Sequence, residues 1–574
     1  MNRRANTALH LDLQRWRMRL VLGLLFAAFA SLALRAIYLQ GWQTDFLNEE
    51  GEKRTNRVVE IPAHRGMITD RRGVPLAVST PVESIWLNPR EAAATPTQIQ
   101  ALASRLGMDP DDLGRLFRDT RRGFVYLRRQ APPEQAAAAL ALGIKGVETR
   151  QEYRRYYPSA EVTAQILGMT NIDDHGQEGI ELAYQSTLAG TPGKKRVLRD
   201  RYGNAVDELE LLRLPKHGRD LALSLNLQIQ YLAYRELADA VRENQARGGG
   251  VVVMDVASGE VLALANYPSF NPNNRSGLTP AQLRNRAAVD VFEPGSTIKP
   301  FLVAAALEVG AIRPDTRIDT GPGWFVVGDK RISDVHPKGV LSVGEAIKVS
   351  SNVATAMIAM DMKSEDYWRQ LSRLGFGAPP GSGFPGEAGG RLRPHESWRQ
   401  LDKAVLGYGH GISVSLLQLA RAYAAIANDG VLMPTTLVKR QDAVIGQRVM
   451  SAETAREVRR MLEMVTQIGG TAPQARVVGY RTAGKTGTAH KYVNGGFARD
   501  RYIASFAGLA PASKPRVVVA VMLDEPSGKN YYGGLVAAPV FANIVAGAMR
   551  FMALPPDAPL ETLPAPGPVI AEAV

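Results

Sequence analysis

The longest uninterrupted apolar stretch of the chain lies near its N-terminus. Residues 20–34 carry no charge, Arg35 follows, and apolar or aromatic residues continue to Trp42. Counted to Leu39, the stretch reaches about 20 residues, enough to span a bilayer if the long Arg35 side chain extends toward the membrane surface. Basic residues at 15, 17 and 19 precede it, and such flanks remain cytoplasmic. The pattern predicts a cytoplasmic tail over 1–19 and a signal-anchor helix over 20–40, with the remainder exported. A cleaved signal peptide is the alternative.

The region from 41 to 220 mixes short strand-like and helical patterns. RGMITDRRGVPLAVST reads as a hairpin that turns at Arg72-Gly73, because glycine supplies the backbone freedom of a tight turn. TPTQIQALASRLG and GQEGIELAYQSTLAG have helical periodicity. We predict a separate α/β domain over 41–220.

From residue 221 the pattern changes to strands at both ends of a largely helical region. GGVVVMDVASGEVLALAN predicts a hairpin that turns at Ser258-Gly259, and YRTAGKTGT, RYIASFAGLAP and PRVVVAVMLDEP predict strands near the C-terminus. Strands at both ends of a helical middle imply an antiparallel sheet with helices packed on it. We predict an α+β domain over 221–556, and a disordered tail over 557–574, which is rich in proline and alanine.

The helical region opens with FEPGSTIKP, which places Ser296 three residues before Lys299. Two side chains at this spacing lie on one face of a helix. Pro300 would clash with the carbonyl of Ser296 inside a helix, so the helix should begin near Ser296. A hydroxyl beside an amine, with a backbone N–H at the helix start, suits acyl transfer through a serine ester. Alone, the motif equally fits a capped surface helix.

Two later motifs favour the catalytic interpretation. Ser350-Ser351-Asn352 precedes an apolar run, and Lys485-Thr486-Gly487-Thr488 lies in a strand-like segment. Individually these residues could be helix caps and a solvated strand lysine. Ser-x-x-Lys, Ser-x-Asn and Lys-Thr-Gly in this order are the motif set of serine acyl-transfer enzymes that react with penicillin.

Composition and charge narrow the remaining functions. The chain has no cysteine, so disulfides, thiol chemistry and cysteine-bound metals are excluded, and no cofactor is expected. The net charge of +13 comes from 69 basic and 56 acidic residues, which are interleaved. No nucleic-acid-binding motif accompanies them, so we expect a basic surface that faces anionic envelope polymers or lipid headgroups. Residues 479–486 match a phosphate-binding loop in letters, but no helical pattern follows them, as such a loop requires.

With these motifs the chain resembles the FtsI-type class B penicillin-binding proteins, the penicillin-binding protein 3 group of division-specific D,D-transpeptidases. The resemblance also covers RGMITDRRG, RRYYP and GQEGIE in the first region, and SFNPNN, RNRAAVDVFEPGSTIKP, KTGTAHK and YYGGLVAAPVF in the second. It implies a membrane anchor, an elongated pedestal domain and a transpeptidase domain like that of serine β-lactamases.

The resemblance also implies roles for individual residues. Ser296 would attack the penultimate D-Ala of a peptidoglycan stem peptide, and Lys299 would take its proton, since apolar surroundings favour the neutral amine. Ser350 would relay a proton to the leaving amine, and Asn352 would bind the donor peptide. The remaining residues implied are Lys485 for positive charge, Thr486, Gly487 and Thr488 for the terminal carboxylate and the oxyanion, and Tyr408, Tyr502, Tyr531 and Tyr532 for the cleft wall.

Several alternatives remain open at this point. His410 stands where the resemblance predicts another aromatic residue. A D,D-carboxypeptidase, an elongation-specific transpeptidase and a silent β-lactam-binding scaffold are competing functions. By resemblance the partners are an FtsW-type glycosyltransferase and the FtsQ, FtsL, FtsB and FtsN division proteins, and β-lactams would acylate Ser296.

Overall fold

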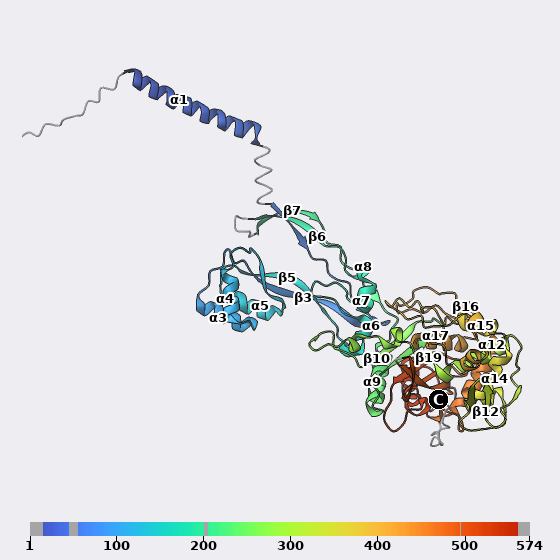
Figure 1. The fold of residues 1–574 in the computed structure, drawn as a ribbon. Coiled ribbons are helices and arrows are strands. Elements are labelled where there is room, and N and C mark those ends of the chain that lie inside the picture. The colour runs from blue at the N-terminus through green and yellow to red at the C-terminus, as the bar shows by residue number, and fades with distance from the viewer. Residues whose placement is uncertain (1–14, 45–55, 200–204, 494, 561–574) are drawn as a thin grey trace, which may run out of the picture. The chain divides into compact units, whose positions relative to one another are not determined.

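The computed structural model describes residues 15–44, 56–199, 205–493 and 495–560 (Figure 1). The chain divides into two compact units. Unit 1 comprises Met1–Ala63, Glu83–Glu152 and Thr191–Lys216, and unit 2 comprises His64–Val82, Tyr153–Gly190 and His217–Val574. The boundary therefore falls inside strands β3 (Pro75–Leu87) and β5 (Val147–Tyr156).

Apart from α1 and β3, the elements of the first 220 residues are short. Besides β3 and β5 they are α1 (Arg15–Ile37), the π-helical turn η1 (Tyr38–Trp42), β1 (Asn56–Ile61), β2 (Ile68–Thr69), α3 (Pro96–Leu106), α4 (Pro110–Arg118), β4 (Val125–Ala131), α5 (Pro133–Leu140), η2 (Ala160–Val162), α6 (Ala164–Leu167), α7 (Gly179–Ala183), α8 (Gln185–Leu188), β6 (Gly193–Arg199) and β7 (Ala205–Arg213).

The following elements make up the rest of unit 2. They are β8 (Leu221–Ala222), α9 (Leu227–Glu243), β9 (Gly248–Asp255), β10 (Val261–Tyr267), α10 (Pro280–Leu283), α11 (Arg286–Val289), η3 (Gly295–Ile298), α12 (Lys299–Glu308), β11 (Arg317–Asp319), β12 (Trp324–Val327), β13 (Lys330–Ser333), β14 (Val340–Ser342), α13 (Val343–Lys348), α14 (Asn352–Asp361), α15 (Ser364–Arg373), η4 (His395–Ser397), α16 (Gln400–Leu406), α17 (Leu416–Ala427), β15 (Val431–Leu432), β16 (Gln447–Arg448), α18 (Ala452–Thr466), η5 (Pro473–Ala475), β17 (Ala483–Val493), β18 (Gly496–Ala510), β19 (Val517–Asp524), α19 (Gly533–Val536) and α20 (Ala538–Phe551).

The N-terminal apolar segment is one helix. Helix α1 and the π-helical turn η1 together cover 28 residues, and none of the apolar window is buried against the protein. At 1.5 Å per residue this is about 42 Å, longer than a hydrocarbon core of about 30 Å. The helix is therefore long and apolar enough to serve as a single-pass membrane anchor. The apolar segment Gly533–Phe551 is also long enough to span a membrane, but it is mostly buried in unit 2, as a core helix is.

Unit 1 contains an antiparallel sheet of β1, β6 and β7 and a small hydrophobic core formed by α3, α4 and the end of β3. Thr95 caps α3 and Asp109 caps α4, and a proline occupies the first turn of each helix. These are the signals that start a helix and satisfy its free N–H groups. The predicted hairpin turn at Gly73, by contrast, lies in unit 2 and adopts a φ of 86°, which favours glycine.

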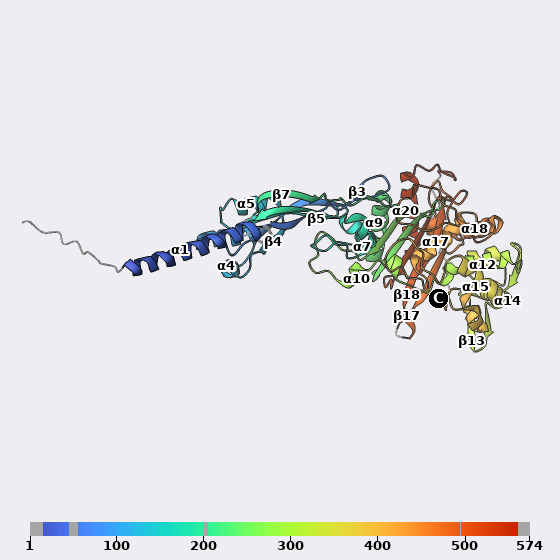
Figure 2. The ribbon, with the colours of Figure 1, turned by 90° about the horizontal axis from the view of Figure 1, so that it is seen from above.

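Unit 2 is built on a five-stranded sheet in the order β10-β9-β19-β18-β17, and all its pairings are antiparallel. Every residue of β9 and β19 is buried, so helices cover both faces of the sheet. Helices α9 and α20 pack on each other and on the sheet, and α17 packs on β9, β18 and β19 (Figure 2). This arrangement confirms the predicted α+β class.

Three of the sequence motifs converge in a buried ion cluster of unit 2. Arg65 of RGMITDRRG donates from Nε to Glu181 of GQEGIE at 2.8 Å, and Arg155 of RRYYP donates from Nε to the same carboxylate at 2.6 Å. Glu181 and Arg65 have no solvent exposure. Because a buried charge is tolerated only when it is paired, the three motifs require one another.

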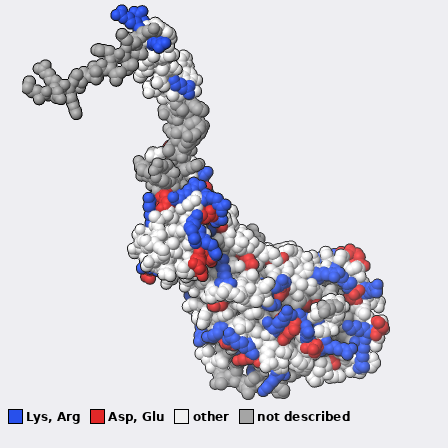
Figure 3. All heavy atoms as spheres, turned by 60° about the vertical axis from the view of Figure 1, so that its left-hand side comes forward, with Lys and Arg blue, Asp and Glu red and all other residues white. Residues whose placement is uncertain are grey.

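The start of the predicted C-terminal tail contacts unit 2, and the surface charges are mixed in sign. Asp557 accepts hydrogen bonds from the backbone of Arg481 and the hydroxyl of Ser513, whereas residues 561–574 of the predicted tail lie outside the described residues. On the face shown in Figure 3, basic and acidic side chains are interleaved rather than segregated into one basic patch.

Candidate active site

The predicted nucleophile lies on a short 3₁₀ turn. Ser296 belongs to η3, and α12 begins at Lys299 with Pro300 in its first turn. The helix therefore starts three residues later than Ser296, because proline is favourable only in the first turn. Tyr423 of α17 donates from its hydroxyl to the carbonyl of Thr297 at 2.9 Å, and this bond ties the turn to α17. Ser296 is 4% exposed.

The Ser-x-x-Lys, Ser-x-Asn and Lys-Thr-Gly motifs meet at the hydroxyl of Ser350. Lys299 donates from Nζ to this Oγ at 3.1 Å, and Lys485 donates to it at 2.8 Å. Lys299 also donates to the carbonyl of Ser350 and to Oδ1 of Asn352, both at 2.7 Å. Both lysines are completely buried. Their amines lie within about 6 Å of each other, a distance at which two positive charges repel strongly in a buried site.

The Ser-x-Asn motif has an unusual backbone. Ser350 has a φ of 61°, a left-handed conformation that costs a non-glycine residue about 1–3 kcal/mol. In this position its carbonyl and hydroxyl both reach Lys299. The next residue, Ser351, caps α14 through its hydroxyl, and Asp334 accepts hydrogen bonds from the same segment.

The Lys-Thr-Gly motif lies on β17, the edge strand of the sheet. A Cβ at Gly487 would come within 2.8 Å of the carbonyl oxygen of Pro294, so glycine permits the strand to lie against the turn that carries Ser296. Thr486 Oγ1 lies 3.1 Å from Lys485 Nζ, and Thr488 Oγ1 accepts the N–H of Gly533 at 3.1 Å. The rejection of a phosphate-binding loop at residues 479–486 agrees with the structure, since an extended strand and not a helix follows the lysine.

The predicted cleft aromatics fall into two groups. Tyr502 and Tyr531 stack with ring centroids 4.1 Å apart, and Tyr532 follows at 4.5 Å, so these three rings form one wall. Tyr408 instead packs in a hydrophobic cluster with residues of β12, β13, α14 and α16. Burial raises its pKa to about 12. Tyr408 is thus a packing residue as well as a proposed cleft residue.

His410, the residue that departs from the expected aromatic pattern, bonds to Glu293 beside the nucleophile turn. Its Nδ1 lies 2.7 Å from Glu293 Oε2, and the N–H of Gly411 donates to Oε1 at 2.9 Å. The imidazole contacts the rings of Tyr408 and Phe497 edge-on. His410 therefore joins the nucleophile turn to the β17–β18 hairpin.

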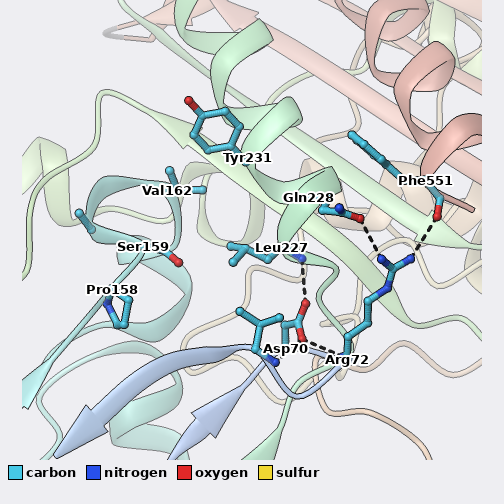
Figure 4. Close-up of a pocket in the computed structure, with 11 residues that line it drawn as sticks. Asp70, Arg72, Pro158, Ser159, Val162, Leu227, Gln228, Tyr231 and Phe551 are labelled. Carbon is cyan, nitrogen blue, oxygen red and sulfur yellow. Dashed lines mark hydrogen bonds between the residues drawn. The ribbon is translucent and has the colours of Figure 1, made fainter.

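A concavity of unit 2 lies between the β2–β3 turn, η2, α9 and the end of α20 (Figure 4). Its volume is about 620 Å³. Asp70 accepts the backbone N–H groups of Arg72, Val74 and Leu227, and Arg72 donates to Gln228 and to the carbonyl of Phe551. The charged groups of this concavity thus serve the fold, and none of the predicted site residues lines it.

Comparisons with known proteins agree with this geometry. Residues 249–546 match the penicillin-binding protein transpeptidase domain, and residues 60–223 match the penicillin-binding protein dimerisation domain. The probable peptidoglycan D,D-transpeptidase PbpC of Pseudomonas aeruginosa is 42% identical over 95% of this chain and 97% of its own length. The peptidoglycan D,D-transpeptidase FtsI of Escherichia coli K12 is 40% identical over 96% and 94%. Penicillin-binding protein 3 of Mycobacterium tuberculosis, solved with aztreonam, is 30% identical over 88% and 99%, with a TM-score of 0.68.

The chain belongs to the penicillin-binding protein transpeptidase family. Its full-length similarity to proteins named FtsI and PenA places it in the class B, penicillin-binding protein 3 group, as the motifs predicted.

The structure also adds residues that the sequence did not single out. Asp334, Glu293, Tyr423 and Thr471 contact the predicted site residues or the turn that carries the nucleophile. None of them lies in a motif with a fixed spacing from its partner, so no sequence signal identifies them.

Proposed function

We propose that this protein is the D,D-transpeptidase that cross-links peptidoglycan stem peptides during septal wall synthesis, with Ser296 as its nucleophile. One observation carries the assignment of the site. Ser350 Oγ is shared by two fully buried lysines, one from the helix that begins just after Ser296 and the other from the edge strand β17. Such an arrangement suits proton transfer to and from a serine hydroxyl.

In the acylation step, Ser296 Oγ attacks the carbonyl carbon of the penultimate D-Ala as its proton passes to neutral Lys299. The new C–O bond forms, the oxygen of the carbonyl becomes negative, and the C–N bond to the terminal D-Ala then breaks. The leaving amine receives a proton from the Ser350 hydroxyl, which is replenished through Lys299. The hydrogen bonds of Ser350 to both lysines support this route.

In the second step an amine of another stem peptide attacks the acyl-serine ester. Its C–N bond forms, the C–O bond to Ser296 breaks, and the proton lost by the amine returns to Ser296 Oγ through the same lysine and serine. Water in place of the amine would give a carboxypeptidase.

The substrate groups have counterparts among the proposed binding residues. Strand β17 lies at one edge of its sheet, and within the described part of the chain no strand pairs with its outer side, so an extended donor peptide can align there. Thr486 and Thr488, with Lys485, would hold the terminal carboxylate, and Asn352 would bind the donor backbone. The stacked wall of Tyr502, Tyr531 and Tyr532 would contact its apolar side chains.

The membrane and partner assignments rest on the anchor helix and on resemblance. We propose that the N-terminus is cytoplasmic, because Arg15, Arg17 and Arg19 lie at the N-terminal end of α1, ahead of its apolar run, and that unit 2 is periplasmic. FtsW-type glycosyltransferase and the FtsQ, FtsL, FtsB and FtsN proteins are the proposed partners, and β-lactams are proposed inhibitors that acylate Ser296.

Product analysis tests the reaction. The full-length protein in detergent is incubated with a pentapeptide donor and an amine acceptor, and products are separated by mass spectrometry. A transpeptidase gives a cross-linked product plus one free D-Ala per cross-link. Free D-Ala without cross-links would identify a carboxypeptidase. A Ser296→Ala variant, which removes only the nucleophilic oxygen, must give neither product.

A further inference from the structure

Glu293, which precedes the nucleophile turn, forms a carboxylate–histidine pair with His410. Its Oε2 lies 2.7 Å from Nδ1 of His410, and its Oε1 accepts the backbone N–H of Gly411 at 2.9 Å. Because an ionised carboxylate can only accept hydrogen bonds, Nδ1 carries the ring proton and donates it. In the neutral imidazole the lone pair is then on Nε2, the atom that can take a proton from another molecule.

The segment that carries His410 runs beside the nucleophile turn. Phe292 and Val414 exchange backbone hydrogen bonds at 3.0 and 2.9 Å, and the N–H of Gly295 donates to the carbonyl of Gly409 at 3.3 Å. A Cβ at Gly409 would lie 2.0 Å from the carbonyl oxygen of Gly295, so glycine permits this approach. The imidazole therefore belongs to the residue that follows a direct backbone contact with the turn.

The ring of His410 is held at its edges but is not enclosed. The rings of Tyr408 and Phe497 meet it edge-on, with centroids 5.3 and 5.7 Å away, and the side chain is 19% exposed. Burial raises the pKa of Tyr408 to about 12, so this neighbour is uncharged near neutral pH. Among the residues that the structure describes, none hydrogen-bonds to Nε2. This nitrogen is thus available to a ligand.

Two further charged side chains near the imidazole are paired with each other. Arg393 and Asp402 line a small concavity together with His410, and they bond to one another at 2.7 Å. In the described part of the chain, Glu293 is the charged group that hydrogen-bonds to the ring. Its carboxylate orients the imidazole and stabilises an imidazolium, as the aspartate of a Ser-His-Asp triad does. The pair therefore has the arrangement of a base that takes up a proton.

The transfer step needs a base that acylation does not. A primary aliphatic amine has a pKa of about 10.4, so at pH 7.5 only about one molecule in 1,000 has the lone pair that attacks an ester. The proposed route through Lys299 and Ser350 returns one proton to the oxygen of Ser296 when the ester breaks. Another group must therefore remove the extra proton of the acceptor ammonium.

We propose that His410, oriented by Glu293, is the catalytic base that deprotonates the acceptor ammonium in the transfer step. Nε2 takes one proton from the ammonium and later releases it to solvent. The resulting amine attacks the ester carbonyl of the acyl-enzyme, the new C–N bond forms, and the C–O bond to Ser296 breaks. The second proton of the amine passes through Lys299 and Ser350 to the serine oxygen. The inference rests on the proposed function, because a purely hydrolytic enzyme has no amine to activate.

The test separates transfer from acylation in the full-length protein in detergent. The acylation rate is measured with a fluorescent penicillin. Cross-linking is measured by mass spectrometry, with a thioester donor and a stem tetrapeptide that has a free lysine or diaminopimelate amine, whichever the unmodified protein accepts. Two variants remove the base. His410→Gln keeps a donor for Glu293, and His410→Phe keeps a ring beside Tyr408 and Phe497.

We expect both variants to acylate within about threefold of the unmodified protein but to cross-link about 100-fold more slowly at pH 7.5, since a positioned base contributes about 10²–10⁴ in rate. From pH 7 to 9 their cross-linking rates should rise about tenfold per pH unit, because the fraction of free amine then limits the reaction. The unmodified protein should show a shallower rise, because its base acts on the abundant ammonium.

His395→Gln is the matched control. His395 also pairs with a carboxylate, that of Glu396 at 3.3 Å, but it lies on η4. Its replacement removes a histidine–carboxylate pair elsewhere in unit 2, so we expect the rates of acylation and cross-linking to be unchanged.

The outcomes separate the inference from the proposed function. If both variants cross-link at close to the unmodified rate, or lose cross-linking only in proportion to acylation, His410 is a structural residue and the inference is wrong. If the unmodified protein acylates but releases only hydrolysed donor with both acceptors, the proposed transpeptidase function fails instead. Should one variant not fold, as its melting temperature will show, the other still decides.

Discussion

Replacement of Ser350 by alanine removes the atom at which the two buried lysines meet. The hydroxyl oxygen accepts from Lys299 at 3.1 Å and from Lys485 at 2.8 Å, and so joins the Ser-x-x-Lys and Lys-Thr-Gly motifs. Without it both amines lose an acceptor in a site that water does not readily enter, and the proposed proton route to the leaving amine is broken.

The size of the effect follows from these two contacts. A hydrogen bond that involves a charged group contributes about 1.5–3 kcal/mol, and one of the two lysines is expected to be neutral, so the loss is about 2–5 kcal/mol. Since about 1.4 kcal/mol corresponds to a tenfold change in rate, acylation should slow by about 30- to 3,000-fold. Ser350→Gly is the matched variant. It lacks the same hydroxyl, but glycine accepts the φ of 61° that strains alanine.

The assay is the rate of covalent labelling by a fluorescent penicillin under pseudo-first-order conditions, with melting temperatures for each variant. We expect the alanine and glycine variants to lose acylation rate alike. Acylation by Ser350→Gly at close to the unmodified rate would refute the reasoning, because backbone strain rather than the hydroxyl would then explain the alanine result.

Three further predictions concern other parts of unit 2. Burial raises the pKa of Asp174 from 3.8 to about 6 despite nearby arginines. Between these two pH values the folded state therefore retains the proton on Asp174, whereas the unfolded state has lost it. The stability that this proton gives is complete below about pH 4 and is lost as pH rises through about 6, by at most about 3 kcal/mol. Asp174→Asn should therefore raise the melting temperature at pH 7.5 but not at pH 4; an equal change at both would contradict the assignment. Gly487→Ala places a Cβ 2.6 Å from Ser505 Oγ, and we expect acylation to fall more than about 100-fold; a rate near normal would show that the strand adjusts. Glu293→Ala removes the acceptor of His410 and Gly411, which should slow acylation about tenfold; an unchanged rate would make this contact irrelevant to the nucleophile turn.

The parts of the fold that could be predicted from the sequence are those determined by residues close together in the chain. The strand-like segments of β17 to β19, the glycine turn at Gly259 and the uncharged run of α1 each depend on neighbouring residues, and the structure has them. The order of the three motifs also indicated the class of site, because each motif has a fixed internal spacing.

Contacts between distant residues could not be predicted in the same way. The bond of Lys485 to Ser350 spans 135 positions, and that of Glu293 to His410 spans 117. Tertiary packing alone determines them. The start of α12 at Lys299 rather than at Ser296 has a local cause, since η3 forms a tighter turn ahead of Pro300. The boundary between the two units could not be read from composition, because the chain crosses it several times and two of the crossings fall inside strands β3 and β5.

The central claim is that Ser296 is the nucleophile of a penicillin-reactive transpeptidase. Intact-mass analysis of the full-length protein after incubation with benzylpenicillin, beside Ser296→Ala, tests it most directly. The account predicts one stoichiometric adduct on the unmodified protein, mapped to the peptide that contains Ser296, and none on the folded variant. No adduct on the folded unmodified protein, or an adduct that persists in Ser296→Ala, would contradict it.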